Sequence, residues 1–178
     1  VHNAAFLLLD LRQQHSLHQQ AAAWLSAAVV NGDHSETLFR AAYHIGMIAE
    51  LPLSVADRER YYPLCLRAAQ GAKRAGDYLS ALRYLRSAQQ LSQRMVTGND
   101  FMLGIDEAEC EFLLGNLATA ARLCAQLAGR PGGLAEKAVA ACLLAEIHMR
   151  QSHRQQALET AIAWLSVFGI SLSRYPDV

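Results

Sequence analysis

The chain has 178 residues and a mass of 19.5 kDa, which suits one domain or one array of repeats. Sixteen Lys and Arg residues balance sixteen Asp and Glu residues, so the chain lacks the basic excess of a dedicated nucleic-acid binder. It contains 31 alanines and 27 leucines but few Val, Ile and Thr residues, a mixture that favours helices and argues against a sheet-based fold.

Two helices are expected in the first fifty residues. The first has a break allowed at Ser16 and stops at the turn dipeptide Asn31-Gly32. Asp33 and Glu36 have the spacing of a capping box, in which two side chains satisfy unpaired backbone N–H groups at a helix start. The second helix therefore begins there and runs to about residue 51.

A third helix begins with another capping signal, formed by Ser54 and Asp57, and runs to about Ala75. A proline within a helix removes a backbone hydrogen bond, so Pro63 marks either a kink or a later helix start near residue 62. Five further helices, separated by short turns, are expected over residues 78–95, 100–114, 117–128, 135–151 and 154–168.

Three of the turns share one pattern. Their second residues are Gly76, Gly115 and Ser152, so the pattern recurs after 39 and then after 37 residues. One alanine precedes each turn position by seven residues and another follows it by five: Ala69 and Ala81, Ala108 and Ala120, Ala145 and Ala157. Small residues there let the two helices of a hairpin approach closely, and neighbouring hairpins stack to bury their apolar stripes. The sequence therefore predicts three helix–turn–helix repeats.

The cysteines form no recognisable motif. Cys65, Cys110, Cys124 and Cys142 are too widely spaced for a CxxC zinc or redox site. Each lies in an apolar helical stretch, so we expect all four to be buried thiols that behave as small hydrophobic residues. Free thiols are typical of a reducing compartment, which favours a cytoplasmic location.

The histidines and the acidic residues also form no site. His15 and His18 can share a helix face, but no metal-binding motif such as HExxH is present. One helix carries a cluster of carboxylates that point to several sides and indicate a solvated face: Asp106, Glu107, Glu109 and Glu111. We therefore expect neither a metal nor a cofactor.

Motifs for phosphate binding and for nucleophilic catalysis are missing from the sequence. It contains no GxxxxGK[ST] loop, no GxGxxG fingerprint and no GxSxG elbow, and the glycine-rich stretch 129–133 is more simply a linker. No apolar run reaches the length of a membrane span, and the N-terminal stretch lacks the features of a signal peptide. We expect a protein that is not an enzyme and does not insert into a membrane.

The turn pattern resembles tetratricopeptide (TPR) repeats, in which G-x-(Y/F)-x-x-A crosses the turn. The strings "GDYLSA" and "GNLATA" at 76–81 and 115–120 carry this resemblance. It implies antiparallel helix hairpins stacked as a TPR-like right-handed superhelix. The match is degenerate, because the units exceed 34 residues and the third lacks both the glycine and the aromatic residue.

Longer strings resemble a more specific family. They are "TLFRAAYHIGMIAE" (37–50), "ALRYL" (81–85) and "AECEFLLG" (108–115). They are similar to the helical region that follows the AAA/STAND-type predicted ATPase module of bacterial multidomain sensor histidine kinases and serine/threonine kinases. The resemblance implies a spacer and interaction segment in a two-component or related signalling protein. The ATPase and the kinase output would then lie outside these 178 residues.

The expected organisation has three parts. Residues 1–56 are lead-in helices that pack on the array, residues 57–170 are three degenerate TPR-like hairpins, and residues 171–178 are an exit linker. The expected function is a non-catalytic scaffold that mediates protein–protein or interdomain contacts, because a stacked helical array presents a continuous surface.

If the TPR alignment holds, first-helix positions line the concave side and form the candidate partner-binding surface. These positions are Arg67, Gln70, Lys73, Arg74, Asp106, Glu109, Glu146, Met149 and Arg150. They place a basic end beside an acidic middle, which a peptide or a neighbouring domain could read. The other interpretation of the same residues is that they are ordinary solvated charges.

Two further alternatives remain open at this stage. A small molecule could bind between repeats, lined by Tyr43, His44, Tyr61 and Tyr62, and regulate an attached ATPase or kinase; core packing explains these residues equally well. The final helix has no obvious polar cap, because Ile162, Leu165 and Phe168 stand beside Trp164. If its outer face is exposed, we expect it to pack against another domain or against a second copy.

Overall fold

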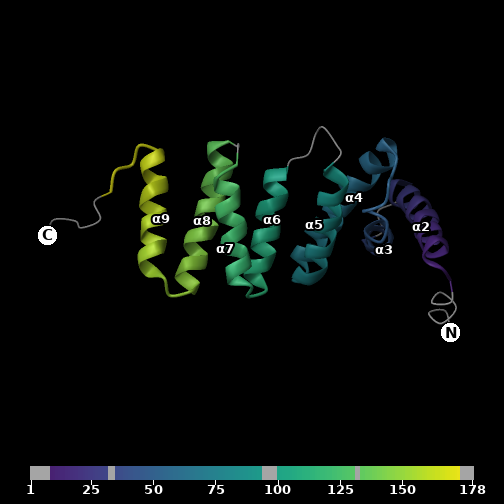
Figure 1. The fold of residues 1–178 in the computed structure, drawn as a ribbon, viewed down its shortest axis with the longest axis horizontal. Coiled ribbons are helices and arrows are strands. Elements are labelled where there is room, and N and C mark those ends of the chain that lie inside the picture. The colour runs from purple at the N-terminus through teal and green to yellow at the C-terminus, as the bar shows by residue number, and fades with distance from the viewer. Residues whose placement is uncertain (1–8, 32–34, 94–99, 131–132, 173–178) are drawn as a thin grey trace. The chain divides into compact units, whose positions relative to one another are not determined.

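The computed structural model describes residues 9–31, 35–93, 100–130 and 133–172, and within these ranges the chain forms eight α-helices and no strand (Figure 1). The helices are α2 (Leu11–Asn31), α3 (Ser35–Gly46), α4 (Val55–Arg74), α5 (Tyr78–Ser92), α6 (Asp100–Leu113), α7 (Leu117–Ala128), α8 (Leu134–Arg150) and α9 (Arg154–Val167). The expected all-α fold is confirmed for these residues. None of these helices is both long enough and apolar enough to cross a lipid bilayer.

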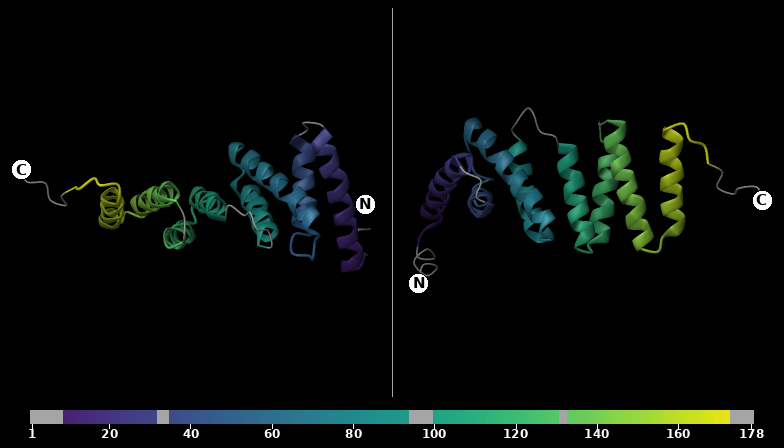
Figure 2. Two further views of the ribbon diagram at one scale, coloured as in Figure 1. Left: turned by 90° about the horizontal axis from the view of Figure 1, so that it is seen from above. Right: turned by 180° about the vertical axis from the view of Figure 1, so that it is seen from behind.

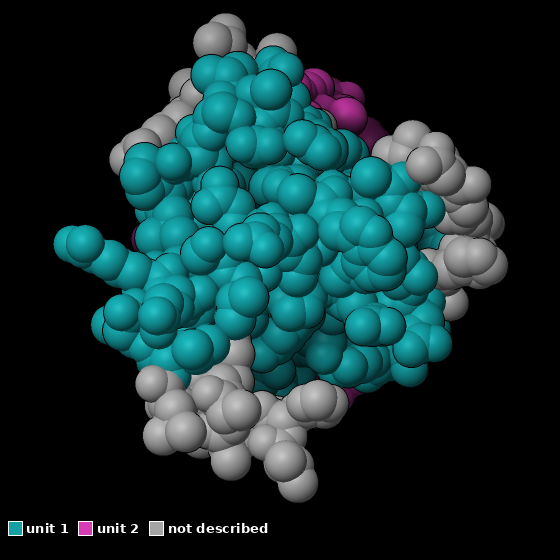
Figure 3. Space-filling model, turned by 90° about the vertical axis from the view of Figure 1, so that its right-hand side faces the viewer, with its two compact units in different colours: residues 1–98 teal, residues 99–178 magenta. Residues whose placement is uncertain are grey.

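Contacts within the chain group the helices into two units. Unit 1 comprises residues 1–98 with α2 to α5, and unit 2 comprises residues 99–178 with α6 to α9 (Figure 3). Within each unit, every helix packs against the helix that follows it in the chain, so that successive helices form antiparallel hairpins (Figures 1 and 2). The first hairpin of the predicted repeat, α4 with α5, lies in unit 1 together with α2 and α3. The other two hairpins make up unit 2.

The three predicted turns adopt one conformation. Gly76, Gly115 and Ser152 have φ angles of 77°, 84° and 62°, in the left-handed region that ends many helices. In each turn the backbone N–H of the next residue donates a hydrogen bond back across five residues: Asp77 to Ala72 at 2.9 Å, Asn116 to Glu111 at 2.8 Å, and His153 to His148 at 2.9 Å. This shared geometry is consistent with the predicted helical repeat.

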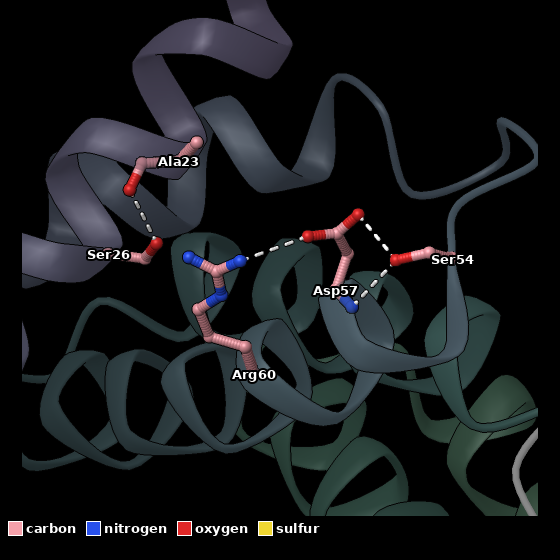
Figure 4. Close-up of polar contacts among 5 residues, drawn as sticks. All are labelled: Ala23, Ser26, Ser54, Asp57 and Arg60. Atoms are coloured by element: carbon pink, nitrogen blue, oxygen red, sulfur yellow. Dashed lines mark hydrogen bonds and ion pairs between the residues drawn. The ribbon is translucent and has the colours of Figure 1, made fainter.

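A local cap explains where α4 begins. Ser54 Oγ accepts a hydrogen bond from the backbone N–H of Asp57 at 3.1 Å and donates one to the Asp57 carboxylate at 2.7 Å (Figure 4). The same carboxylate pairs with Arg60 at 3.2 Å. Because the cap sets the helix start at Val55, Pro63 lies inside α4, and the alternative start near residue 62 is wrong.

The other expectations for unit 1 concern α2 and the start of α3. α2 runs through Ser16 without interruption, so the break allowed there does not occur. Ser26 is fully buried on α2 and donates a hydrogen bond to the carbonyl of Ala23 at 2.9 Å, which satisfies its hydroxyl within an apolar contact (Figure 4). The capping box predicted at Asp33 and Glu36 includes a residue that lies outside the described ranges.

The alanines of the predicted repeat lie in the helix contacts. Five of them are buried, namely Ala69, Ala81, Ala108, Ala120 and Ala157, whereas Ala145 is half-buried. In unit 2 two core clusters extend from α6 and α7 onto α8: Ala108, Phe112, Ala120 and Cys124 with Ile147, and Phe101, Ile105 and Leu127 with Ala140. α8 therefore covers the groove between α6 and α7.

Candidate interaction surfaces

The predicted basic residues form an exposed face on α4 in unit 1. Arg67, Gln70 and Arg74 are exposed, and Lys73 beside them is half-buried. Spacings of three and four residues put Arg67, Gln70 and Arg74 on one side of the helix. Lys73 and Arg74 occupy its last turn, where the helix dipole favours positive charge. We call Arg67, Gln70, Lys73 and Arg74 the basic face of α4.

The remaining predicted residues lie on α6 and α8 in unit 2, two helices that contact each other. Asp106 and Glu109 are half-buried on α6, and Glu146, Met149 and Arg150 are exposed on α8. The guanidinium carbon of Arg150 lies 5.2 Å from the centre of the Phe112 ring, a cation–π contact that ties the end of α8 to α6. We call these five predicted residues the α6/α8 face.

The nine predicted residues therefore fall into two sets, four in unit 1 and five in unit 2. The set in unit 1 is basic. The set in unit 2 contains three carboxylates, one arginine and one methionine, so it is the more acidic of the two. Each set by itself offers a charged surface that a partner of opposite charge can approach.

One carboxylate of the acidic cluster contradicts the expectation of a solvated face. Glu111 is only 5% exposed and accepts a hydrogen bond from Asn116 Nδ2 at 2.7 Å, across the turn between α6 and α7. Asp106, Glu107 and Glu109 are half-buried. The expectation is therefore wrong for Glu111, because this side chain folds back onto the turn that follows its own helix.

The four residues proposed to line a ligand pocket have different environments. Tyr61 is 1% exposed in the core of unit 1, and the Arg60 guanidinium lies 5.6 Å from the centre of its ring. Tyr62 is half-buried, and His44 pairs with a histidine of α2. Tyr43, by contrast, is 57% exposed on α3, where it lines a groove between α3 and α5.

This α3/α5 groove has a volume of about 380 Å³. Its wall carries two tyrosines and two arginines among smaller residues: Tyr43, Tyr84, Arg83 and Arg86, with Ala42, Gly46, Met47, Ser80, Ser87 and Gln90. α3 and α5 approach closely here, since a Cβ added to Gly46 would lie 3.0 Å from Ser87 Oγ. Sequence reasoning missed the arginines of this groove because they lie on a second helix of a hairpin, outside the positions that the TPR alignment selects.

A pair of histidines joins α2 to α3. The Nδ1 atoms of His18 and His44 lie 2.8 Å apart, so one ring must be neutral in order to accept the hydrogen bond that the other donates. Burial lowers the pKa of both imidazoles. The positive charge of His15 lowers the pKa of His18 further, and the charges of His18 and Arg40 do so for His44. The sequence indicated only that His15 and His18 can share a helix face. The histidine that contacts His18 is His44, which lies 26 residues further along the chain.

Cysteine burial follows the prediction at three of four positions. Cys65, Cys110 and Cys124 are buried, and burial raises the pKa of Cys65 to about 12 and that of Cys124 to about 11. Cys142 is exposed, so the expectation of a buried thiol is wrong there. It lines a second groove, between α8 and α9.

This α8/α9 groove has a volume of about 230 Å³ and an almost wholly apolar wall. α8 contributes Ala138, Ala141, Cys142 and Ala145, α9 contributes Thr160, Ala161, Trp164 and Leu165, and Phe168 follows at the C-cap of α9. Of the apolar residues singled out on the final helix, Phe168 is 49% exposed, and Ile162, Trp164 and Leu165 are half-buried. The apolar side of this helix is therefore partly exposed, and its packing against another domain or a second copy stays a prediction.

Within the described ranges, no group of three or more His, Cys, Asp or Glu side chains is arranged to hold a metal ion. Comparisons of the chain with protein-family models, with curated proteins and with solved structures find no match. The features that bear on function are thus the basic face of α4, the α6/α8 face and the two grooves.

Proposed function

We propose that the chain is a non-catalytic, TPR-like interaction segment of a bacterial signal-transduction ATPase or kinase, where it binds neighbouring domains or a peptide partner. In this proposal the hairpins belong to a right-handed superhelix, the parent protein is cytoplasmic, and catalysis takes place in modules outside this chain. No nucleic acid, metal or cofactor takes part.

The observation that carries the proposal is that the three hairpin turns have the same backbone geometry. Gly76, Gly115 and Ser152 share one backbone conformation and one pattern of returning hydrogen bonds, although their side chains differ. Hairpins repeated in this way are the building blocks of helical-repeat proteins, which present extended surfaces to other proteins.

Charge supports a role in binding proteins. The basic face of α4 places Arg67 and Arg74 on one exposed side of a helix, seven residues apart. Exposed charges of one sign steer a partner of opposite sign and set its orientation more than they add to affinity. The partner chemistry that fits unit 1 is therefore an acidic peptide or an acidic domain surface.

The resemblance to the helical region of signalling ATPases supports the setting. The strings that carry it, 37–50, 81–85 and 108–115, lie mainly on α3, α5 and α6. They include buried residues of both units, such as Ile45, Leu85 and Ala108. The similar strings therefore consist of helix-packing residues and include no catalytic motif. This suits a scaffold.

Charge reversal on α4 tests the proposal in the parent protein. Replacing both Arg67 and Arg74 by Glu keeps two exposed, helix-compatible side chains but inverts the charge of the face. We expect the parent's signal-dependent ATPase or kinase activity to lose its regulation while the helical content stays unchanged. Arg12→Glu is the matched control, because Arg12 is an exposed arginine on another helix of the same unit. Normal regulation in the double variant would argue against this face as a contact.

The alternative function, sensing of a small molecule that regulates an attached ATPase or kinase, is favoured by the α3/α5 groove. Its tyrosines and arginines suit an anionic ligand with an aromatic or planar group. A ligand that binds only the folded chain must raise its unfolding temperature. A thermal-shift screen with such compounds tests this function, and Arg83→Ala should abolish any shift that arises in this groove.

A further inference from the structure

A polar pocket lies in unit 1 where the end of α3, the start of α4 and the end of α5 meet. It has a volume of about 340 Å³, at the lower end of the range of small-molecule sites. Its wall consists of Ala49 and Glu50 in the turn after α3, Arg58 on α4, Gln90 on α5 and Gln93 at the C-cap of α5. Gln90 also lines the α3/α5 groove, and the other four residues do not. We call this the Arg58 pocket.

Arg58 is a buried cation in the wall of this pocket. The residue is only 4% exposed. Its Nε donates a hydrogen bond to the carbonyl of Leu53 at 3.2 Å, and its Nη2 donates one to the carbonyl of Leu51 at 3.3 Å. These bonds hold the loop before α4, but they use only two of the five N–H donors of a guanidinium and supply no negative charge. A buried charge is costly unless an opposite charge accompanies it.

Among the residues that the structure describes, no carboxylate forms an ion pair with Arg58. Asp57, its neighbour in the sequence, pairs with Arg60 at 3.2 Å. Glu50 lines the same pocket, but its carboxylate accepts a hydrogen bond from Gln90 Nε2 at 2.7 Å and lies too far from Arg58 to pair with it. The pocket thus holds one positive and one negative side chain with space between them.

From this arrangement we infer that the Arg58 pocket binds a free α-amino acid with an amide side chain. The carboxylate of the ligand accepts hydrogen bonds from the remaining N–H groups of Arg58, and its ammonium group lies beside Glu50. Glu50 would repel a simple anion and Arg58 would repel a simple cation, whereas a zwitterion satisfies both charges. The amides of Gln90 and Gln93 each offer a donor and an acceptor, which a third amide complements.

The test uses L-asparagine and L-glutamine as probes, because they differ by a single methylene. Each is titrated into the whole ¹⁵N-labelled chain while the backbone amide signals are followed by NMR. We expect at least one of them to bind saturably with a Kd below about 1 mM and to shift the signals of Ala49, Glu50 and Gln93.

Matched analogues of the probes show which ligand charges the pocket recognises. Succinamic acid and glutaramic acid are the two amino acids without the ammonium group, and the amides of asparagine and glutamine lack the α-carboxylate. Each analogue should bind at least about tenfold more weakly than the amino acid from which it derives, since it leaves one charge of the pocket without a counterpart.

Two variants of exposed glutamates locate the ammonium group. Glu50→Gln keeps the shape of the side chain and an oxygen that accepts from Gln90, but it removes the negative charge, so it should weaken amino-acid binding by about tenfold. Glu36→Gln is the control, because Glu36 lies in the first turn of α3 and outside the pocket. Arg83→Ala, in the α3/α5 groove, should also leave binding unchanged. All three changes keep Arg58 and its bonds to the loop.

The outcomes decide the inference. Binding that needs both ligand charges and the Glu50 carboxylate supports it. Absence of saturable binding by both amino acids up to about 10 mM overturns it, as does equal binding of the analogues or full binding in Glu50→Gln. The site goes beyond the proposed interaction function and can fail separately from it, because Arg67 and Arg74 lie outside the pocket.

Discussion

His18 and His44 face each other between α2 and α3 with their Nδ1 atoms 2.8 Å apart. His18 is 6% exposed, and the Tyr43 ring makes T-shaped contacts with both imidazoles. Since two imidazolium ions cannot share a hydrogen bond between their Nδ1 atoms, this contact exists only while at least one of the rings is neutral. The packing of the first two described helices is thereby linked to protonation.

The histidine pair predicts that unit 1 loses stability as the pH falls below neutrality. The folded chain lowers the pKa of both histidines from 6.5, mainly by burial, so the unfolded chain binds more protons just below pH 6.5. The stabilisation is therefore fully present above pH 6.5 and is lost as the pH falls through the lowered pKa values. Urea unfolding followed by circular dichroism, at about pH 7.5 and about pH 5.5, measures the difference.

The matched variants for this pH effect are His44→Gln and His153→Gln. His44→Gln removes one member of the pair, so it should reduce the difference in unfolding free energy between the two pH values. His153 is exposed at the turn before α9, and its replacement should leave the difference as large as in the unmodified chain. An equal pH dependence in all three proteins would show that the pair does not control it.

Replacing the turn glycines that have left-handed φ angles is expected to lower the unfolding free energy through backbone strain alone, without a steric clash. A Cβ at Gly76 or Gly115 would meet no atom within 4 Å, yet the φ angles of 77° and 84° are unfavourable for any residue with a Cβ. Gly76→Ala and Gly115→Ala should each lower the unfolding free energy by about 1 kcal/mol. Gly129→Ala is the control, because φ is −82° at this residue and alanine there should be neutral or mildly stabilising. Equal effects at all three sites would contradict the shared turn geometry.

At the third turn, a substitution is expected to change the unfolding free energy in the opposite direction. Ser152 holds a φ angle of 62° without being a glycine, so Ser152→Gly should relieve strain and raise the unfolding free energy by about 0.5–1 kcal/mol. Ser166→Gly makes the same replacement within α9 and should instead destabilise the chain, since glycine is a poor helix former. Both values come from chemical denaturation of the whole chain. A loss of stability in Ser152→Gly would refute the strain at this turn.

The cysteines predict a simple titration of thiols. In the folded chain only Cys142 should react rapidly with a disulfide reagent, because Cys65, Cys110 and Cys124 are buried and burial raises the pKa of Cys65 to about 12. All four should react after denaturation. Cys142→Ser should remove the rapid phase completely. A second rapidly reacting thiol in the native chain would be incompatible with this packing.

Much of the local structure follows from short-range signals in the sequence. The turns at Gly76 and Gly115 and the cap at Ser54 depend on neighbouring residues, so the helix limits around them were predictable. Contacts between residues that are distant in the sequence were not predictable. The pairing of His18 with His44 depends on which faces of α2 and α3 meet, a property of tertiary packing that no spacing along the chain encodes.

The candidate site shows the same limit. The TPR alignment selected Arg67, Gln70, Lys73 and Arg74 as partner-binding positions, and the structure shows only that three of them are exposed on α4 and that Lys73 is half-buried. The sequence could not reveal that Glu111 turns inward to accept a hydrogen bond from Asn116, or that Cys142 is exposed in a groove. Both depend on which other parts of the chain pack against a helix. The pattern of residue types along a helix predicts which face is apolar, but it does not show whether another helix covers that face.

The central claim is that this chain works by binding another protein domain. The most direct measurement is calorimetric titration of the purified chain with the separately purified ATPase, sensor or kinase domains of the proposed parent protein, at low and at high salt. The account predicts saturable one-to-one binding to one of these domains, weakened by salt and lost in the Arg67→Glu, Arg74→Glu double variant. Absence of binding to every neighbouring domain at low salt would contradict it.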